Sequence, residues 1–131
     1  MLKKLLILGV VSGVLAGLAG FIYQKVYVEI LGEGFLNIVK PVNIFAASLI
    51  GTIVAAFGYF LLSKVLKGYT EIVFNLLFSI ITFATLIGPI SFQMPADELA
   101  PPELFPGLAI PMHFFPALAW YTLKPLFAKS V

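Results

Sequence analysis

His113 is the only histidine in this chain of 131 residues, and it lies in an apolar run between Pro111 and Pro116. An ionisable side chain inside such a run is a candidate functional site, because burying its charge is costly. Pro116 has no N–H to give to the Met112 carbonyl, so that carbonyl needs another partner. Hydroxyl groups expected at a comparable depth are those of Ser48, Thr82 and Thr85.

Three interpretations of His113 stay open at this point. The ring can be neutral and hydrogen-bonded, with a packing role. It can line a polar cavity and handle a proton or a ligand. It can also ligate a haem or a metal ion, which would need a second ligand from another chain, because the sequence has one histidine and no cysteine. The residues therefore predict no self-contained metal centre, no cofactor and no catalytic group.

A second set of polar side chains follows helical spacing. Asn75, Ser79 and Thr82 are separated by four and then three residues, which places them on one face of a helix. At a rise of about 1.5 Å per residue, Asn75 and Tyr59 fall at a similar depth in neighbouring helices, so a hydrogen bond between them is possible. These groups either join helices or form a polar track for a solute or ion.

The elements that must position these residues are four long apolar stretches, and 61% of the chain is hydrophobic. Each stretch is close to the ~20 residues that cross a ~30 Å hydrocarbon layer as a helix. We therefore expect an all-α integral membrane protein: a single domain over residues 1–131, folded as an antiparallel bundle of four transmembrane helices. The stretches cover about residues 5–23, 42–62, 71–92 and 106–124.

The lysines predict the orientation of these spans. Lys25 and Lys40 lie in the loop after the first stretch, and the loop after the third is acidic, with Asp97, Glu98 and Glu103. The other six of the eight lysines flank the opposite ends: Lys3, Lys4, Lys64, Lys67, Lys124 and Lys129. By the positive-inside rule both ends of the chain are cytoplasmic, and we expect the plasma (inner) membrane of a bacterium. The lysines expected on the cytoplasmic side account for the net charge of +2. We therefore expect the lipid bilayer as a partner and expect no binding to nucleic acid.

Small residues recur every four positions in the first two stretches. Such stripes let helix backbones approach closely, and dispersion then holds the pair together in lipid. Either the two stretches pack against each other within one chain, or the glycine stripe is the seam of a homo-oligomer. The residues are Gly9, Gly13 and Gly17 in the first stretch, and Ala47, Gly51 and Ala55 in the second.

Two further expectations concern the membrane boundaries. Residues 24–41 have an amphipathic pattern, from which we expect the first helix to extend to about Leu31 and a short interfacial helix to follow. Aromatic side chains near the ends of the stretches indicate a belt at the lipid interfaces. They are Tyr23, Tyr27, Tyr59, Tyr69, Trp120 and Tyr121.

Three local features resemble a family of small bacterial four-helix membrane proteins of unknown function. They are the small-residue run Ser12–Tyr23 ending in tyrosine, Pro89 near the end of the third stretch, and the pair Met112 and His113. The resemblance implies the four-helix membrane fold and no particular activity.

Three functions remain as expectations. The first is an accessory or scaffold-type membrane protein that acts through helix packing, either alone or as a subunit of a larger membrane complex. The second is a small transporter or channel that builds its pathway as a homo-oligomer, lined by His113 and the Asn75 face. The third is a membrane enzyme or binder acting on a lipid or quinone, although the sequence lacks the paired acids and nucleophile–base pairs such chemistry uses.

Overall fold

All regular structure in the described part of the chain is helical, which confirms the all-α prediction. The computed structural model describes residues 1–32, 35–93, 95–96 and 101–127. The predicted loop charges Asp97 and Glu98, the flanking Lys129 and Glu33 of the amphipathic segment lie outside these residues.

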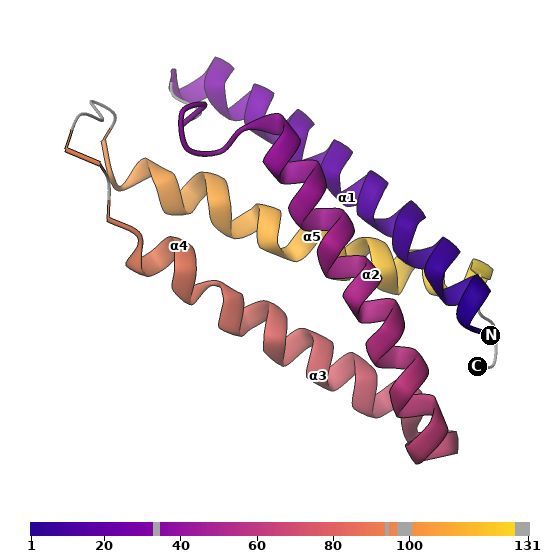
Figure 1. Cartoon of the computed structure of the whole chain (residues 1–131). Helices are drawn as coiled ribbons and strands as arrows, with labels where there is room; N and C mark the ends of the chain where they lie inside the picture. Colours follow the sequence, from indigo (N-terminus) through magenta and orange to yellow (C-terminus); the bar gives the residue numbers. More distant parts are fainter. Residues whose placement is uncertain (33–34, 94, 97–100, 128–131) are drawn as a thin grey trace.

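Successive long helices of the described residues run in opposite directions along the molecule (Figure 1). Helix α1 runs over Leu2–Leu31, α2 over Pro41–Leu66 and the short 3-10 helix η1 over Lys67–Tyr69. They are followed by α3 at Thr70–Thr85, α4 at Ile87–Ser91 and α5 at Leu104–Phe127. The first turn of α1 and the last turn of α5 lie at the same end of the molecule as η1.

Two helical stretches of the described residues are long and apolar enough to cross a membrane. One is α1, with 30 residues, and the other is the stretch Pro41–Ser91, with 51 residues, which includes α2, η1, α3 and α4. The second stretch reverses direction at η1, where Lys67 adopts a φ of 48°. Helix α5 matches the predicted position of the fourth span but is not one of these two stretches.

The predicted single helix over residues 71–92 is divided into α3 and α4, and Pro89 gives the reason. Proline has no N–H to donate to the Thr85 carbonyl four residues earlier, and its ring crowds that turn. The backbone tightens at the break, where the Leu86 amide donates to the Phe83 carbonyl at 3.1 Å.

Helices α1 and α2 form the most extensive contact in the molecule, and glycines on α1 make it close. A Cβ atom added to Gly13 would lie 2.6 Å from Thr52 Oγ1 and 2.8 Å from Leu49 Cα. One added to Gly9 would lie 2.9 Å from the Thr52 carbonyl oxygen, and one on Gly17 would lie 2.4 Å from the Phe45 ring. Only glycine fits at these three positions while the two backbones keep this separation.

The α2 side of this contact differs from the prediction. Ala47 and Gly51 are exposed, and a Cβ added to Gly51 meets nothing within 4 Å, so of the three residues predicted only Ala55 is buried. The buried face of α2 includes Ser48, Thr52 and Ala56, one residue further along, and Thr52 and Ala56 lie against the α1 glycines. Thr52 is compatible with an apolar contact because its hydroxyl donates to the Ser48 carbonyl of its own helix at 2.9 Å.

Two buried clusters close the ends of the bundle. One contains Trp120, Tyr59 and Phe74 packed on the first turns of α1, and the other contains Tyr27, Phe105 and Phe35. The predicted aromatic belt is therefore wrong for Tyr59, Trp120 and Tyr27, which are 0%, 0% and 8% exposed. Interior hydrogen-bond acceptors draw the tyrosines inward, whereas Tyr69 is 72% exposed.

The segment between α1 and α2 contains a turn in place of the predicted interfacial helix. Helix α1 does extend to Leu31 and ends with Gly32 at a φ of 75°. The amides of Ile38 and Val39 both donate to the Phe35 carbonyl, at 2.9 and 2.7 Å. Phe35 itself is 1% exposed and packs edge-on against Phe105, so burial of this ring fixes the path of the segment.

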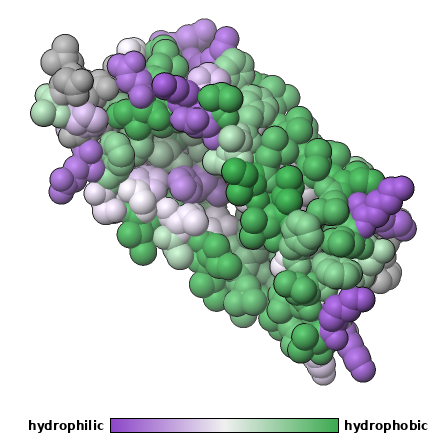
Figure 2. Space-filling view, in the orientation of Figure 1, coloured by the Kyte–Doolittle hydropathy of each residue, from purple (hydrophilic) through white to green (hydrophobic). Residues whose placement is uncertain are grey.

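The surface separates into an apolar middle and polar ends. In Figure 2 hydrophobic residues cover the length of the visible face, and the hydrophilic ones gather toward the two ends of the helices. Large apolar side chains are exposed along α1, α2 and α3, including Val14 at 44%, Val54 at 64% and Ile80 at 54%.

Candidate functional site

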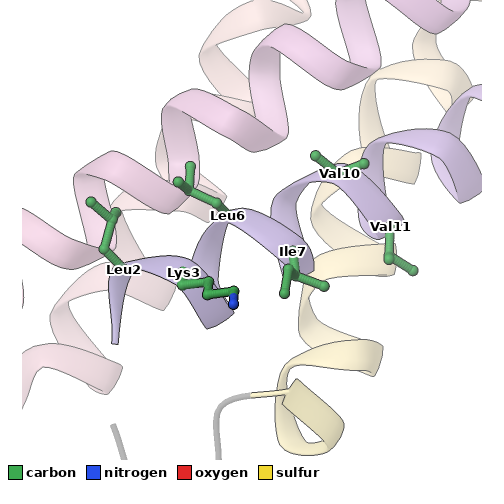
Figure 3. Close-up of a pocket in the computed structure, with 6 residues that line it drawn as sticks. All are labelled: Leu2, Lys3, Leu6, Ile7, Val10 and Val11. Carbon is green, nitrogen blue, oxygen red and sulfur yellow. The ribbon is translucent and has the colours of Figure 1, made fainter.

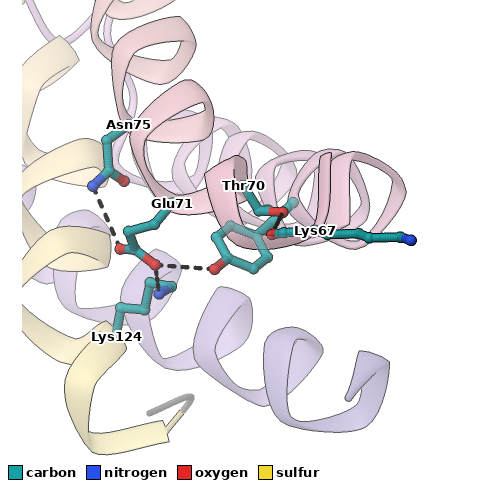
Figure 4. A network of polar contacts seen from close by, with 6 residues as sticks. Lys67, Thr70, Glu71, Asn75 and Lys124 are labelled. Carbon is teal, nitrogen blue, oxygen red and sulfur yellow. Dashed lines mark hydrogen bonds and ion pairs between the residues drawn. The ribbon is translucent and has the colours of Figure 1, made fainter. Parts of the chain in front are cut away.

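The largest polar cluster of the described residues centres on Glu71, in the first turn of α3. Its Oε2 atom accepts a hydrogen bond from the Tyr59 hydroxyl of α2 at 3.0 Å and forms an ion pair with Lys124 of α5. Its Oε1 atom accepts from the Asn75 amide at 3.4 Å. Figure 4 shows Asn75 and Lys124 approaching the carboxylate from different sides. One carboxylate thus joins three helices.

The ion pair is unequal in burial. The Lys124 side chain is 8% exposed, whereas that of Glu71 is 46% exposed. The Lys124 ammonium also lies over the Tyr59 ring, 4.8 Å from its centroid, where the ring face stabilises a cation. Lys124 is therefore the member of the pair that needs compensation, because its charge has been taken out of water.

The cluster continues along α3 through Tyr121 of α5. The Tyr121 hydroxyl donates to the Asn75 carbonyl at 3.0 Å and lies 2.8 Å from Ser79 Oγ. Since the single Tyr121 proton goes to the carbonyl, Ser79 is the donor in the second contact. These bonds hold α3 against α5 over about one helical turn.

Tyr59 and Asn75 were predicted to lie at a similar depth, and the structure brings them to the same carboxylate. Each donates to a different oxygen of Glu71, so the acid stands between them. Lys124 was predicted only as a charge flanking the fourth stretch, and its ion pair with Glu71 was not predicted. An acid at the start of one span and a lysine near the end of an antiparallel one are at equal depth, which was a usable signal.

His113 of α5 meets Thr85, the last residue of α3. Its Nδ1 atom lies 3.1 Å from Thr85 Oγ1. Of the three hydroxyl residues predicted near it, Thr85 is the one that forms this hydrogen bond, whereas Ser48 and Thr82 are buried in α2 and α3. The Pro89 break at Leu86 follows directly, so the histidine is attached to the end of α3.

The hydrogen bonds around Thr85 assign the tautomer of His113. The Thr85 hydroxyl donates its single proton to the Thr82 carbonyl at 2.6 Å. With that proton used, the hydroxyl accepts from His113, and this assignment from the hydrogen-bond geometry puts the ring proton on Nδ1 and leaves Nε2 unprotonated.

Tyrosines anchor the opposite end of α1. The Tyr23 hydroxyl donates to the Gly107 carbonyl at 2.7 Å, and that of Tyr27 donates to the Leu104 carbonyl. Gln24, 2% exposed, donates from Nε2 to the Val39 carbonyl at 2.7 Å. The carbonyls of the first turn of α5 accept from α1 side chains, which fixes where α5 begins.

The chemistry these groups support is structural. Within the described residues there is no group of three or more His, Asp or Glu side chains that could hold a metal ion. Glu71 accepts from three donors, and Lys124 is paired with it. The arrangement neutralises charge and joins helices.

Comparison with known proteins gives no assignment. A scan against protein-family models, a search of curated proteins and a search of solved structures each find no match to this chain. The resemblance to the four-helix membrane family therefore has no support from a family model.

The unequal burial of the Glu71–Lys124 pair predicts unequal effects of removing each charge. Glu71→Gln leaves a buried ammonium uncompensated and should cost about 3 kcal/mol of unfolding free energy. Lys124→Met leaves a half-exposed carboxylate that water can solvate, and should cost about 1 kcal/mol or less. The double variant should resemble Lys124→Met. Denaturant titration in detergent micelles measures all three, with Lys64→Met, an exposed lysine, as control. Equal costs for the two single variants would contradict this description.

The tautomer of His113 is a second prediction, and the single histidine makes it accessible to NMR. Protein labelled with ¹⁵N-histidine should show the proton on Nδ1 when the ring is neutral. Thr85→Val should shift these resonances, because it removes the acceptor. Thr122→Val is the matched control, since that hydroxyl bonds the Leu118 carbonyl of its own helix. A proton on Nε2, or identical spectra for Thr85→Val and the parent protein, would show that the contact does not form.

Proposed function

We propose that this chain is an integral membrane protein with four antiparallel spans: α1, α2, α3 with α4, and α5. Their lengths support this, since at ~1.5 Å per residue they measure about 45, 39, 33 and 36 Å, against a hydrocarbon layer of ~30 Å. The exposed apolar surface along the bundle supports it too, because soluble monomers rarely expose apolar patches beyond a few hundred Å².

The charges support an orientation with both ends of the chain in the cytoplasm. Lys3, Lys4, Lys64 and Lys67 are all exposed at the end of the bundle where α1 starts and α2 ends. A concentration of lysine at one end is the signature of the cytoplasmic side. The family resemblance points to a bacterium, and hence to its plasma membrane.

The function that fits best is an accessory or scaffold-type role, as a subunit of a larger membrane complex. The observation that carries it is that the polar side chains join helices within the chain, whereas one apolar face stays exposed. Polar side chains of α2, α3 and α5 are used in joining these helices to each other, while α3 and α4 present a broad apolar face. Residues of that face are more than half exposed, namely Ile72, Leu76, Ile80, Phe83, Ile87 and Ile90. A helix of a partner subunit can pack on this face.

A homo-oligomeric transporter or channel is the second candidate. One observation favours it: Thr85 is exposed and His113 is only partly buried, so their contact lies near the surface of a single chain. In a symmetric oligomer this surface can face a shared pathway.

Affinity purification in mild detergent tests the proposal. Membranes are first washed at alkaline pH, which releases peripheral proteins and should retain this one. Mass spectrometry should then find a foreign membrane subunit in stoichiometric amount, and Ile80→Trp on the α3 face should remove it. Ile50→Trp is the matched control, because Ile50 is an exposed isoleucine on α2, at 64% against 54% for Ile80.

Three outcomes would contradict parts of the proposal. Release by the alkaline wash overturns membrane integration. A lone monomer, or a foreign subunit lost equally from both variants, overturns the accessory role on the α3 face. A symmetric oligomer of this chain alone supports the transporter or channel instead.

A further inference from the structure

An open apolar groove of about 510 Å³ lies on the first turns of α1, and none of its lining residues belongs to the Glu71 cluster. Five aliphatic side chains and one lysine line it: Leu2, Lys3, Leu6, Ile7, Val10 and Val11 (Figure 3). They form two adjacent stripes with a spacing of four residues, one from Leu2 to Val10 and the other from Lys3 to Val11. The groove follows α1 for about 14 Å at 1.5 Å per residue.

Charge is confined to one end of this groove. Lys3 lies at the end of the groove nearest the N-terminus, where α1 begins. Lys4 is the next residue, and both lysines are exposed. Among the described residues, Lys3 makes no ion pair. The inner end is lined by Val10 and Val11 only, and the first acidic residue of α1 is Glu29. The groove is thus complementary to a molecule with one anionic end and an extended apolar chain.

We propose that this groove binds one anionic phospholipid of the cytoplasmic leaflet, with an acyl chain along α1 and the phosphate on Lys3. The inference rests on the proposed membrane orientation, which puts Lys3 at the cytoplasmic face. The groove length matches one leaflet, which is half of the ~30 Å hydrocarbon layer. That leaflet carries the negative surface potential, which attracts a lysine at its boundary.

The groove has room for an extended acyl chain along α1. A volume of about 510 Å³ is in the usual range for small-molecule sites. An acyl chain is narrow enough to lie between the stripes.

Native mass spectrometry of the full chain in detergent tests the charge requirement. Phosphatidylglycerol and phosphatidylcholine with the same acyl chains are added in turn. The parent protein should retain one phosphatidylglycerol and bind phosphatidylcholine more weakly. Lys3→Gln should weaken phosphatidylglycerol binding about fivefold, the factor for ~1 kcal/mol per lysine near an anionic surface. Lys64→Gln, which removes an exposed lysine elsewhere on the same end, should leave binding unchanged.

A second pair of variants tests the groove itself. Val10→Phe fills it and should abolish retention of the lipid. Val14→Phe adds the same ring to α1 at a residue of matching exposure, 44% against 46%, outside the groove, and should have no effect.

Equal binding of the two lipids by the parent protein would overturn the inference. So would equal effects of Lys3→Gln and Lys64→Gln, or of Val10→Phe and Val14→Phe. Each of these results leaves membrane integration intact, whereas release of the protein by an alkaline wash removes the orientation on which the inference rests.

Discussion

The close approach of α1 to α2 is the constraint on which the rest of this structure depends. Helices with apolar exteriors gain little from the hydrophobic effect when lipid surrounds them, so close backbone contact must supply much of the attraction. Glycines of α1 place its backbone against Leu49 and Thr52 of α2, with no room for even one added carbon at Gly13. This contact sets the separation and crossing of the first two helices.

The other helices are positioned relative to that pair by polar bonds near their ends. Tyr23 and Tyr27 of α1 hold the first turn of α5. At the opposite end Glu71 joins α3 to Tyr59 of α2 and Lys124 of α5. Such bonds are modest individually in a membrane, about 0.6 kcal/mol on average, but they are directional. Packing therefore brings the helices together, and these bonds determine which ends meet.

The sequence predicted the helices better than their faces. Hydropathy and length located the helical runs, and the amphipathic pattern extended α1 to Leu31. The α2 face was missed because Ser48, Thr52 and Ala56 have the same four-residue spacing as Ala47, Gly51 and Ala55, one residue further along. Tyr59 and Trp120 were predicted at the lipid interface, but both are buried. A ring that is partly polar fits the lipid interface and the protein interior equally well, so the residue type does not distinguish them. Glu71 and Lys124 are 53 residues apart in sequence, so no local pattern links them, and only their equal depth in antiparallel helices indicates the pair.

One matched pair of glycine variants tests the close α1–α2 contact most directly. Gly13→Ala adds a carbon that meets the backbone of α2, and overpacking of this kind costs about 1–3 kcal/mol. Gly51→Ala adds the same carbon where nothing lies within 4 Å, and removing glycine from a helix should be neutral or slightly stabilising. Thermal unfolding in detergent, followed by circular dichroism, should show a lower Tm for Gly13→Ala only. Equal Tm values for the two variants would contradict the close contact.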